Sequence, residues 1–239
     1  MNTLVMGASG ETGRLLVDQL VNAGQKVKII VRSPDKLPEN WIRNNMITVV
    51  HAGIAKIKIN EMAELIRDCQ AVACCLGHNL TIKGIFGPPR KLVTNAVQLT
   101  CKAILQNAPE KPVKFVLMNT AGNRNRDLNE SESTGEKIVS LLLRLILPPH
   151  LDNEKAADYL RVKVGKNNPV IEWTAVRPDN LINEKEVSGY SLHISPTRSP
   201  IFNPGETSRI NVGHFMANLI TNQNIWNKWK GNMPVIYNT

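Results

Sequence analysis

Aromatic residues are scarce in this chain. Phe, Trp and Tyr make up 5% of its 239 residues, whereas a nucleic-acid interface is typically a basic stripe with interleaved aromatic side chains. The formal net charge is +9, but the basic residues are scattered along the chain. We therefore expect no nucleic-acid partner, and the positive charge is equally compatible with a solvated surface or with a polyanionic cofactor.

Cysteine and histidine are few, and neither has the spacing of a metal site. The four cysteines contain no C-x-x-C pair, and the five histidines show no metal-ligand spacing. Cys74 and Cys75 are neighbours in an expected strand, so their side chains should point to opposite faces of the sheet. We expect no metal centre, and we interpret the cysteines as small buried apolar residues in a reducing cytosol.

Hydrophobic runs of membrane-spanning length are also absent. The longest apolar run covers residues 138–147, is interrupted by Arg144 and is followed by Pro148 and Pro149. A membrane-spanning helix needs about 20 residues, so this run predicts a buried helix and no membrane partner. Because Met1 lies only a few residues before the first expected strand, we expect no N-terminal targeting signal and a cytoplasmic protein.

What the chain does contain is a regular alternation of apolar runs with helix-length segments. The expected strands cover residues 3–6, 27–31, 47–50, 71–76, 113–118 and 171–176, and the expected helices cover residues 11–23, 60–67 and 90–106, with Asn60 as an N-cap. Such alternation predicts a parallel sheet with right-handed crossovers and helices on both faces. The predicted fold class is α/β, a doubly wound parallel sheet of the Rossmann type, in a single domain over residues 1–239.

Two regions interrupt the alternation. Residues 123–133 are polar and charged without periodicity, which predicts a mobile loop over the carboxyl end of the fifth strand. Residues 189–206 contain three prolines and several polar residues, so we expect a small irregular C-terminal lobe with a hairpin within residues 183–208. Late insertions in this architecture usually cover the substrate, and we assign that role to the lobe.

The stretch from Gly7 to Gly13 has the features of a diphosphate-binding turn. It follows an apolar strand and precedes a helical pattern, which is the context that makes such a glycine spacing informative. Glycines let the backbone approach a ligand closely, and a helix N-terminus offers free N–H groups to an anion. The alternative is a plain strand-to-helix turn. The residues expected to bind the cofactor here are Gly7, Ser9, Gly10, Glu11, Thr12 and Gly13, with hydroxyl donors at positions 9 and 12.

The end of the second strand discriminates between the two nicotinamide cofactors. An NAD-binding protein carries an acidic residue about 20 positions beyond the glycines, where it binds the ribose 2′-hydroxyl. This chain has Arg32 there, with Ser33 beside it and Lys36 nearby, and a guanidinium binds a phosphate through two hydrogen bonds. We therefore expect NADPH rather than NADH. The alternative is that Arg32 is an ordinary surface residue.

Residues that follow the other strands complete the predicted site, because ligands of doubly wound sheets lie at the carboxyl ends of the strands. They are Leu76 and Gly77 after the fourth strand, Asn119 and Thr120 after the fifth, and Pro178 and Asn180 after the sixth. For His78, Asn79 and Arg177, an equally good interpretation is a polar surface or structural role.

These motifs resemble the atypical short-chain dehydrogenase/reductases, and within them the NmrA-like group and the biliverdin reductase B/flavin reductase type. The resemblance covers most of the chain and rests on residues 7–13, 31–38, 75–77, 120–122, 173–178 and 207–212. It implies a Rossmann fold that binds a nicotinamide dinucleotide. It points less strongly to any one activity than to the fold and the cofactor.

The resemblance also places the family's catalytic positions on this chain. Thr120 falls on the serine position after the fifth strand, and Lys155 falls on the lysine of the family's Tyr-x-x-x-Lys pair. The tyrosine position holds Leu151, so the general acid that would protonate an alkoxide is missing. Lys155 either holds the nicotinamide ribose or is an exposed helical lysine. Tyr159, one helical turn later, is more often a packing residue than a catalytic one.

A site with cofactor, hydroxyl and lysine but no tyrosine fits acceptors that take hydride into a conjugated system, such as flavins, quinones and biliverdin-like tetrapyrroles. The sequence therefore predicts an NADPH-dependent reductase of a small-molecule acceptor. Arg124 and Arg126 are candidates for attracting an anionic acceptor, although a solvated charge run is the commoner interpretation.

Two alternatives remain open for the function. One is an NADP(H)-binding sensor or scaffold without catalysis, whose protein partner would contact residues 138–147. The other is a nucleotide-sugar epimerase or dehydratase, which the lost tyrosine and the small late lobe disfavour.

Overall fold

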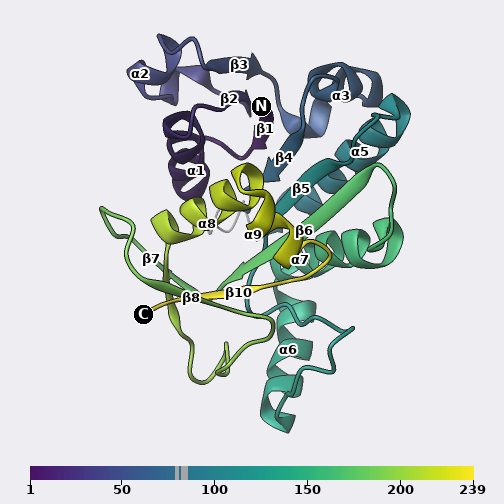
Figure 1. The fold of residues 1–239 in the computed structure, drawn as a ribbon. Coiled ribbons are helices and arrows are strands. Elements are labelled where there is room, and N and C mark those ends of the chain that lie inside the picture. Colours follow the sequence, from purple (N-terminus) through teal and green to yellow (C-terminus); the bar gives the residue numbers. More distant parts are fainter. Residues whose placement is uncertain (79–80, 82–85) are drawn as a thin grey trace.

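An eight-stranded sheet forms the centre of the protein (Figure 1). The computed structural model describes residues 1–78, 81 and 86–239, with Lys36 described only in its backbone. The strand order is β3-β2-β1-β4-β5-β6-β10-β8, and all neighbours are parallel except β8 and β10. The strands of this sheet are β1 (Asn2–Met6), β2 (Lys26–Val31), β3 (Ile47–His51), β4 (Ala71–Cys74), β5 (Val113–Met118), β6 (Ile171–Pro178), β8 (Tyr190–His193) and β10 (Val235–Asn238).

Helices cover both faces of this sheet. Three of them, α3 (Ile59–Ile66), α5 (Leu92–Asn107) and α7 (Pro148–Asp158), bury apolar side chains against one face. The other face is covered by α1 (Glu11–Asn22), α8 (Arg209–Thr221) and α9 (Gln223–Trp229). The predicted doubly wound α/β fold is thus confirmed. Its topological switch point lies between β1 and β4, from which the later strands continue in opposite directions.

Side chains along single strands show why the sheet needs both layers. In β5, Phe115 and Leu117 are buried in the core under α5, whereas Val116 is buried in the core under α8. Cys74 belongs to the first core and Cys75 packs against the second, as the alternation of strand residues predicts. Burial raises the pKa of the Cys74 thiol to about 12, so this thiol is protonated at neutral pH.

The expected element boundaries lie within two residues of the observed ones, and those of β4 and α3 are among the ones that shift. β4 ends at Cys74 rather than at residue 76, and the next residue, Cys75, packs with its carbonyl group against Gly7. α3 begins at Ile59 with Lys58 as its N-cap, so Asn60 is not the cap. The Lys58 backbone N–H donates to the Glu61 carboxylate at 2.7 Å, which fixes the start of the helix one position earlier.

The prediction of a hairpin near the C-terminus is wrong. Within residues 183–208 the chain contributes β8 to the edge of the main sheet, where it pairs with the last strand, β10. A separate parallel pair is formed by β7 (Asn180–Ile182) and β9 (Glu206–Ser208). The sequence pattern did not indicate β10, and without that strand the partner of β8 could not be recognised.

The longest apolar run is a helix, α6 (Thr134–Ile146), but it is not buried as predicted. It projects from the body of the molecule (Figure 1). Five aliphatic side chains are between 48% and 74% exposed: Ile138, Leu141, Leu142, Leu145 and Ile146. Their spacing gathers them on one side of the helix, and this side is exposed.

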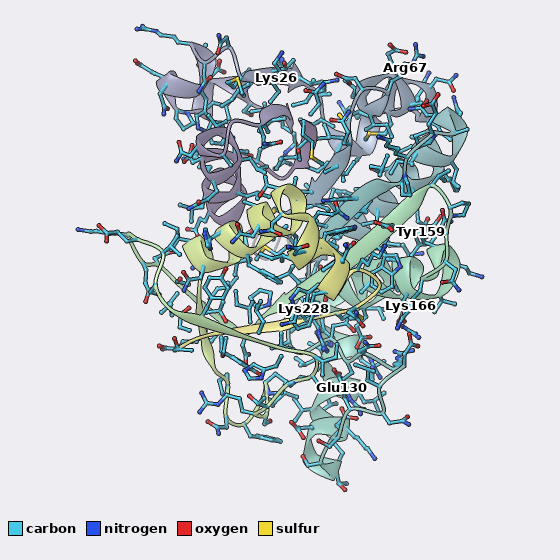
Figure 2. The ribbon with its side chains drawn as sticks, in the orientation of Figure 1. Lys26, Arg67, Glu130, Tyr159, Lys166 and Lys228 are labelled. Carbon is cyan, nitrogen blue, oxygen red and sulfur yellow. The ribbon has the colours of Figure 1, made fainter. Side chains whose placement is uncertain are left out.

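Residues 123–133 are held by a buried ion pair, which corrects the expectation of a mobile loop. Arg177, at the end of β6, is fully buried, and Glu130 in the loop is 7% exposed. Arg177 Nη2 donates to Glu130 Oε1 at 2.7 Å and Nη1 donates to the Asn123 carbonyl at 2.9 Å. Arg177 Nε donates to the Met233 carbonyl at 2.6 Å. Arg177 is therefore a structural residue that joins the loop to β6 and to the chain before β10 (Glu130 is labelled in Figure 2).

We expect Glu130→Ala to lower the free energy of unfolding by about 3 kcal/mol or more, because it leaves the Arg177 guanidinium buried without its counterion. Urea denaturation followed by circular dichroism measures this change. The control is Glu64→Ala, which breaks an exposed pair with Arg67 and should cost about 0.5 kcal/mol or less. Equal effects of the two substitutions would contradict the anchoring role.

Candidate functional site

The turn between β1 and α1 is built on glycines for steric reasons. Gly7 has a φ of +80°, and a Cβ there would lie 2.5 Å from the Cys75 carbonyl oxygen. A Cβ on Gly13 would lie 2.1 Å from the Gly7 carbonyl oxygen. Gly10 is the N-cap of α1, and no described side chain caps this helix. Its first N–H groups are therefore available to an anion.

A groove of about 270 Å³ runs from this turn across the carboxyl ends of β1 to β4. It is closed on one side by residues 52–56, which follow β3. The predicted cofactor-binding residues that line it are Gly7, Ser9, Gly10, Arg32, Leu76 and Gly77. The structure thus brings together, at the switch point, residues that are up to 70 positions apart in the sequence.

Lys56 is a lining residue that sequence reasoning missed. It ends the short helix η2 (Ile54–Lys56), and with Arg32 it lines both the groove and a neighbouring open hollow. In the described part of the chain, neither cation forms an ion pair or a side-chain hydrogen bond with another residue. The signal in the sequence is that Lys56 follows the third expected strand, whose carboxyl end lies at the same edge of the sheet as the glycine turn.

The remaining residues of the predicted cradle lie beside the groove rather than in its lining. The Glu11 carboxylate forms an ion pair with Arg209, with 2.8 Å between Oε2 and Nε. Thr12 and Gly13 are buried under the turn, and Ser33 is exposed at the N-cap of the helix η1 (Pro34–Lys36). The side chain of Lys36 lies outside the described structure.

Asn119 and Thr120 follow β5 and form a tight polar corner. Asn119 is 6% exposed, and its Nδ2 donates to the Asn153 carbonyl in α7 at 2.9 Å. Its Oδ1 accepts from the Thr120 backbone N–H and from Asn123 Nδ2. The Thr120 hydroxyl oxygen accepts from the Gly122 N–H at 3.3 Å, which leaves the hydroxyl proton free to donate. Asn119 therefore positions Thr120.

Pro178 is the last residue of β6, and Asn180 is the first residue of β7. The Pro178 carbonyl accepts from the Ala121 N–H at 2.8 Å, and the Asn180 N–H donates to the Gly205 carbonyl at 3.0 Å. A separate hollow, of about 540 Å³, opens directly beyond Ala121 and Gly122, apart from the groove and from the open hollow beside it. It lies between α6 with the preceding loop on one side and residues 195–201 on the other.

Lys155 lines neither the groove beside the glycine turn nor the hollow beyond Ala121 and Gly122. Lys155 is exposed on α7 and lines a shallow surface depression together with Lys91, Asn95 and Tyr159. Tyr159, labelled in Figure 2, packs against the core on the α5 side of the sheet. Burial raises the pKa of its hydroxyl above the usual value, which makes Tyr159 a weaker proton donor at neutral pH.

A buried histidine–aspartate pair follows β4. His78 Nε2 lies 2.8 Å from Asp152 Oδ2 in α7. Asp152 also accepts the backbone N–H groups of Val93 and Thr94, at 2.8 and 3.0 Å. Asp152 was not predicted, and it fixes α7 against the first turn of α5. Asn79 lies outside the described residues.

The described residues, 1–78, 81 and 86–239, contain neither a candidate metal site nor a candidate membrane-spanning helix. No group of three or more His, Cys, Asp or Glu side chains there is arranged to hold a metal ion. Within the same residues, no helix combines the length and the apolar character needed to cross a membrane.

A family model described as NAD(P)H-binding matches residues 7–223. A curated relative from Arabidopsis thaliana, described as an uncharacterized chloroplastic protein, is 27% identical over 192 residues. The alignment covers 77% of this chain and 66% of that relative, so the chain spans slightly less than two thirds of its length.

Solved structures share the fold at low sequence identity. A short-chain dehydrogenase/reductase from Veillonella parvula, solved with NADP, is 15% identical with a TM-score of 0.70, over 99% of this chain and 94% of that one. A candidate NADH-flavin reductase from Streptococcus pneumoniae is 16% identical with a TM-score of 0.66, over the whole of both chains. The anaerobillin reductase ChuY from Escherichia coli O157:H7 is 12% identical with a TM-score of 0.69, over 100% and 97%.

Proposed function

We propose, from the premise that this chain belongs to the NAD(P)H-binding family, that it is an NADPH-dependent reductase of a conjugated acceptor. The observation that carries the choice of cofactor is the pair Arg32 and Lys56 beside the glycine turn. Two cations without described partners favour a phosphate, whereas a bare ribose would be matched by a carboxylate. The Veillonella parvula structure, solved with NADP, supports this choice by similarity of fold.

The proposed acceptor class follows from what lies at the nicotinamide end. Leu151 supplies no proton, Lys155 lies in a different depression, and Thr120 is the hydroxyl that the strand ends provide. The bound dinucleotide supplies a hydride, and a conjugated acceptor takes it up together with one proton from water. No alkoxide forms, so no general acid of tuned pKa is required. The flavin and anaerobillin reductases among the similar folds support this class.

A second candidate function is a nucleotide-dependent sensor, and the observation that favours it is the exposed apolar side of α6. Five exposed aliphatic side chains on one helix face are typical of a surface that a protein partner covers. A pull-down with and without NADPH separates the two functions, because the sensor requires a nucleotide-dependent partner and no hydride transfer.

We expect Arg32→Ala and Lys56→Ala each to weaken NADPH binding at least about tenfold, or by about 1.4 kcal/mol. NADH binding should change less than about twofold, since it lacks the 2′-phosphate that both side chains would contact. Titration calorimetry measures both affinities. Lys58→Ala is the matched control, because Lys58 is two positions from Lys56 and lines neither the groove nor the open hollow beside it. Equal losses for both nucleotides would contradict phosphate recognition.

Stopped-flow measurement of NADPH oxidation tests the acceptor class. We expect turnover with FMN, biliverdin or a quinone, and none with a simple ketone, because only the ketone requires a general acid. Nucleotide binding without oxidation by any of these acceptors would contradict the reductase assignment and support the sensor.

A further inference from the structure

The hollow beyond Thr120 has two walls that are joined to each other. One wall is formed by Ala121, Gly122, the following loop and α6, and the other by residues 195–201. Ser199 Oγ donates to Glu136 Oε1 at 2.5 Å and so links the two walls. The two walls of the hollow are therefore held in place by a side-chain hydrogen bond at the carboxyl ends of the strands.

All three carboxylates that line this hollow already have donors within the protein. Glu130 is paired with the buried Arg177. Glu132 accepts from Arg124 Nη1 at 2.5 Å and from Ser140 Oγ at 3.3 Å. Glu136 accepts from Ser199 and from both the N–H and the hydroxyl of Ser133. These hydrogen bonds with Ser199 and Ser133 hold the pKa of Glu136 below its usual value.

Two cationic side chains of the hollow keep donors that no described residue accepts. Arg124 Nε is buried and has no hydrogen-bond partner among the described residues. Arg198 is exposed on the opposite wall, and in the described structure its guanidinium forms no hydrogen bond and no ion pair. Asp179 influences Arg198 only at longer range. The Arg124 side chain as a whole is 35% exposed, and its Nη2 forms no hydrogen bond in the described structure, so this end of the guanidinium can donate to an acceptor in the hollow.

We propose that this hollow binds the anionic group of the acceptor, a carboxylate or a phosphate, through Arg124 and Arg198. The inference rests on the proposed reductase function and specifies its substrate class as anionic conjugated molecules. Guanidinium groups bind both carboxylates and phosphates through paired hydrogen bonds. With its anionic group in the hollow, the acceptor places its conjugated part toward Thr120 and the nicotinamide end.

Arg126 provides an internal comparison within the same loop. It lies two positions from Arg124, pairs with Asp158 at 3.5 Å, and does not line the hollow. The structure thus distinguishes Arg124 from Arg126, which were equal candidates in the sequence for attracting an anionic acceptor. Arg126→Ala is therefore a matched control for the removal of one positive charge.

Pairs of acceptors that differ only in the anionic group test this proposal. They are FMN against riboflavin for a phosphate, and biliverdin against its dimethyl ester for carboxylates. For at least one pair, we expect the wild-type protein to show a kcat/KM about tenfold higher with the anionic member, mainly through KM. Arg198→Ala should bring this ratio close to one, Arg198→Lys should restore part of it, and Arg126→Ala should leave it unchanged.

Arg124→Ala should lower the same ratio, but it also removes the partner of Glu132, so the exposed Arg198 is the decisive position. The pair that responds to Arg198→Ala identifies phosphate or carboxylate as the ligand group. A wild-type ratio near one for both pairs, or a ratio unchanged by Arg198→Ala, would overturn the proposal.

Binding measurements distinguish a failure of the proposed reductase function from a failure of the proposed anion site. If no acceptor oxidises NADPH, the dissociation constants of FMN and riboflavin, measured by fluorescence quenching with NADP⁺ present, replace kcat/KM. Biliverdin and its dimethyl ester are compared by absorbance titration in the same way. Preference for an anionic member that is lost in Arg198→Ala then supports the anion site alone, and equal binding of both members of both pairs contradicts it.

Discussion

The close approach of the chain after β1 to the chain after β4 is the constraint on which the cofactor side of this protein depends. Gly7 touches the Cys75 carbonyl so closely that no side chain fits between them. This contact closes the turn and allows α1 to begin directly over the switch point. Arg32, Lys56, Leu76 and Gly77 line one groove because they follow parallel strands whose carboxyl ends lie at the same edge of the sheet.

A different interaction supports the acceptor side. The fully buried Arg177 draws together the loop after β5, the end of β6 and the segment before β10. Several kcal/mol of desolvation make such a pair a weak source of net stability, but it strongly disfavours any arrangement that separates the partners. The walls of the hollow beyond Ala121 and Gly122 are positioned by this pair and by the bond between Ser199 and Glu136.

The sequence predicted the features that depend on local pattern. The early strands, the glycine turn and Arg32 at the end of β2 could be recognised because each is a short motif with its own flanks. Lys56 could have been recognised in the same way, because it follows the third expected strand. Arg198 could not, because it lies in an irregular segment whose position depends on pairing elsewhere. Residues 123–133 looked mobile since their ion-pair partner, Arg177, is 47 positions from Glu130. The apolar run of α6 looked buried because hydrophobic spacing predicts a helix face, not what covers that face.

The most direct test of the account is a crystal structure of the complex with NADP⁺. We expect the diphosphate at the first N–H groups of α1, the 2′-phosphate between Arg32 and Lys56, and the nicotinamide ring facing Thr120 with an open path to the hollow beyond Gly122. A 2′-phosphate in solvent away from both cations, or a nicotinamide ring remote from Thr120, would contradict it.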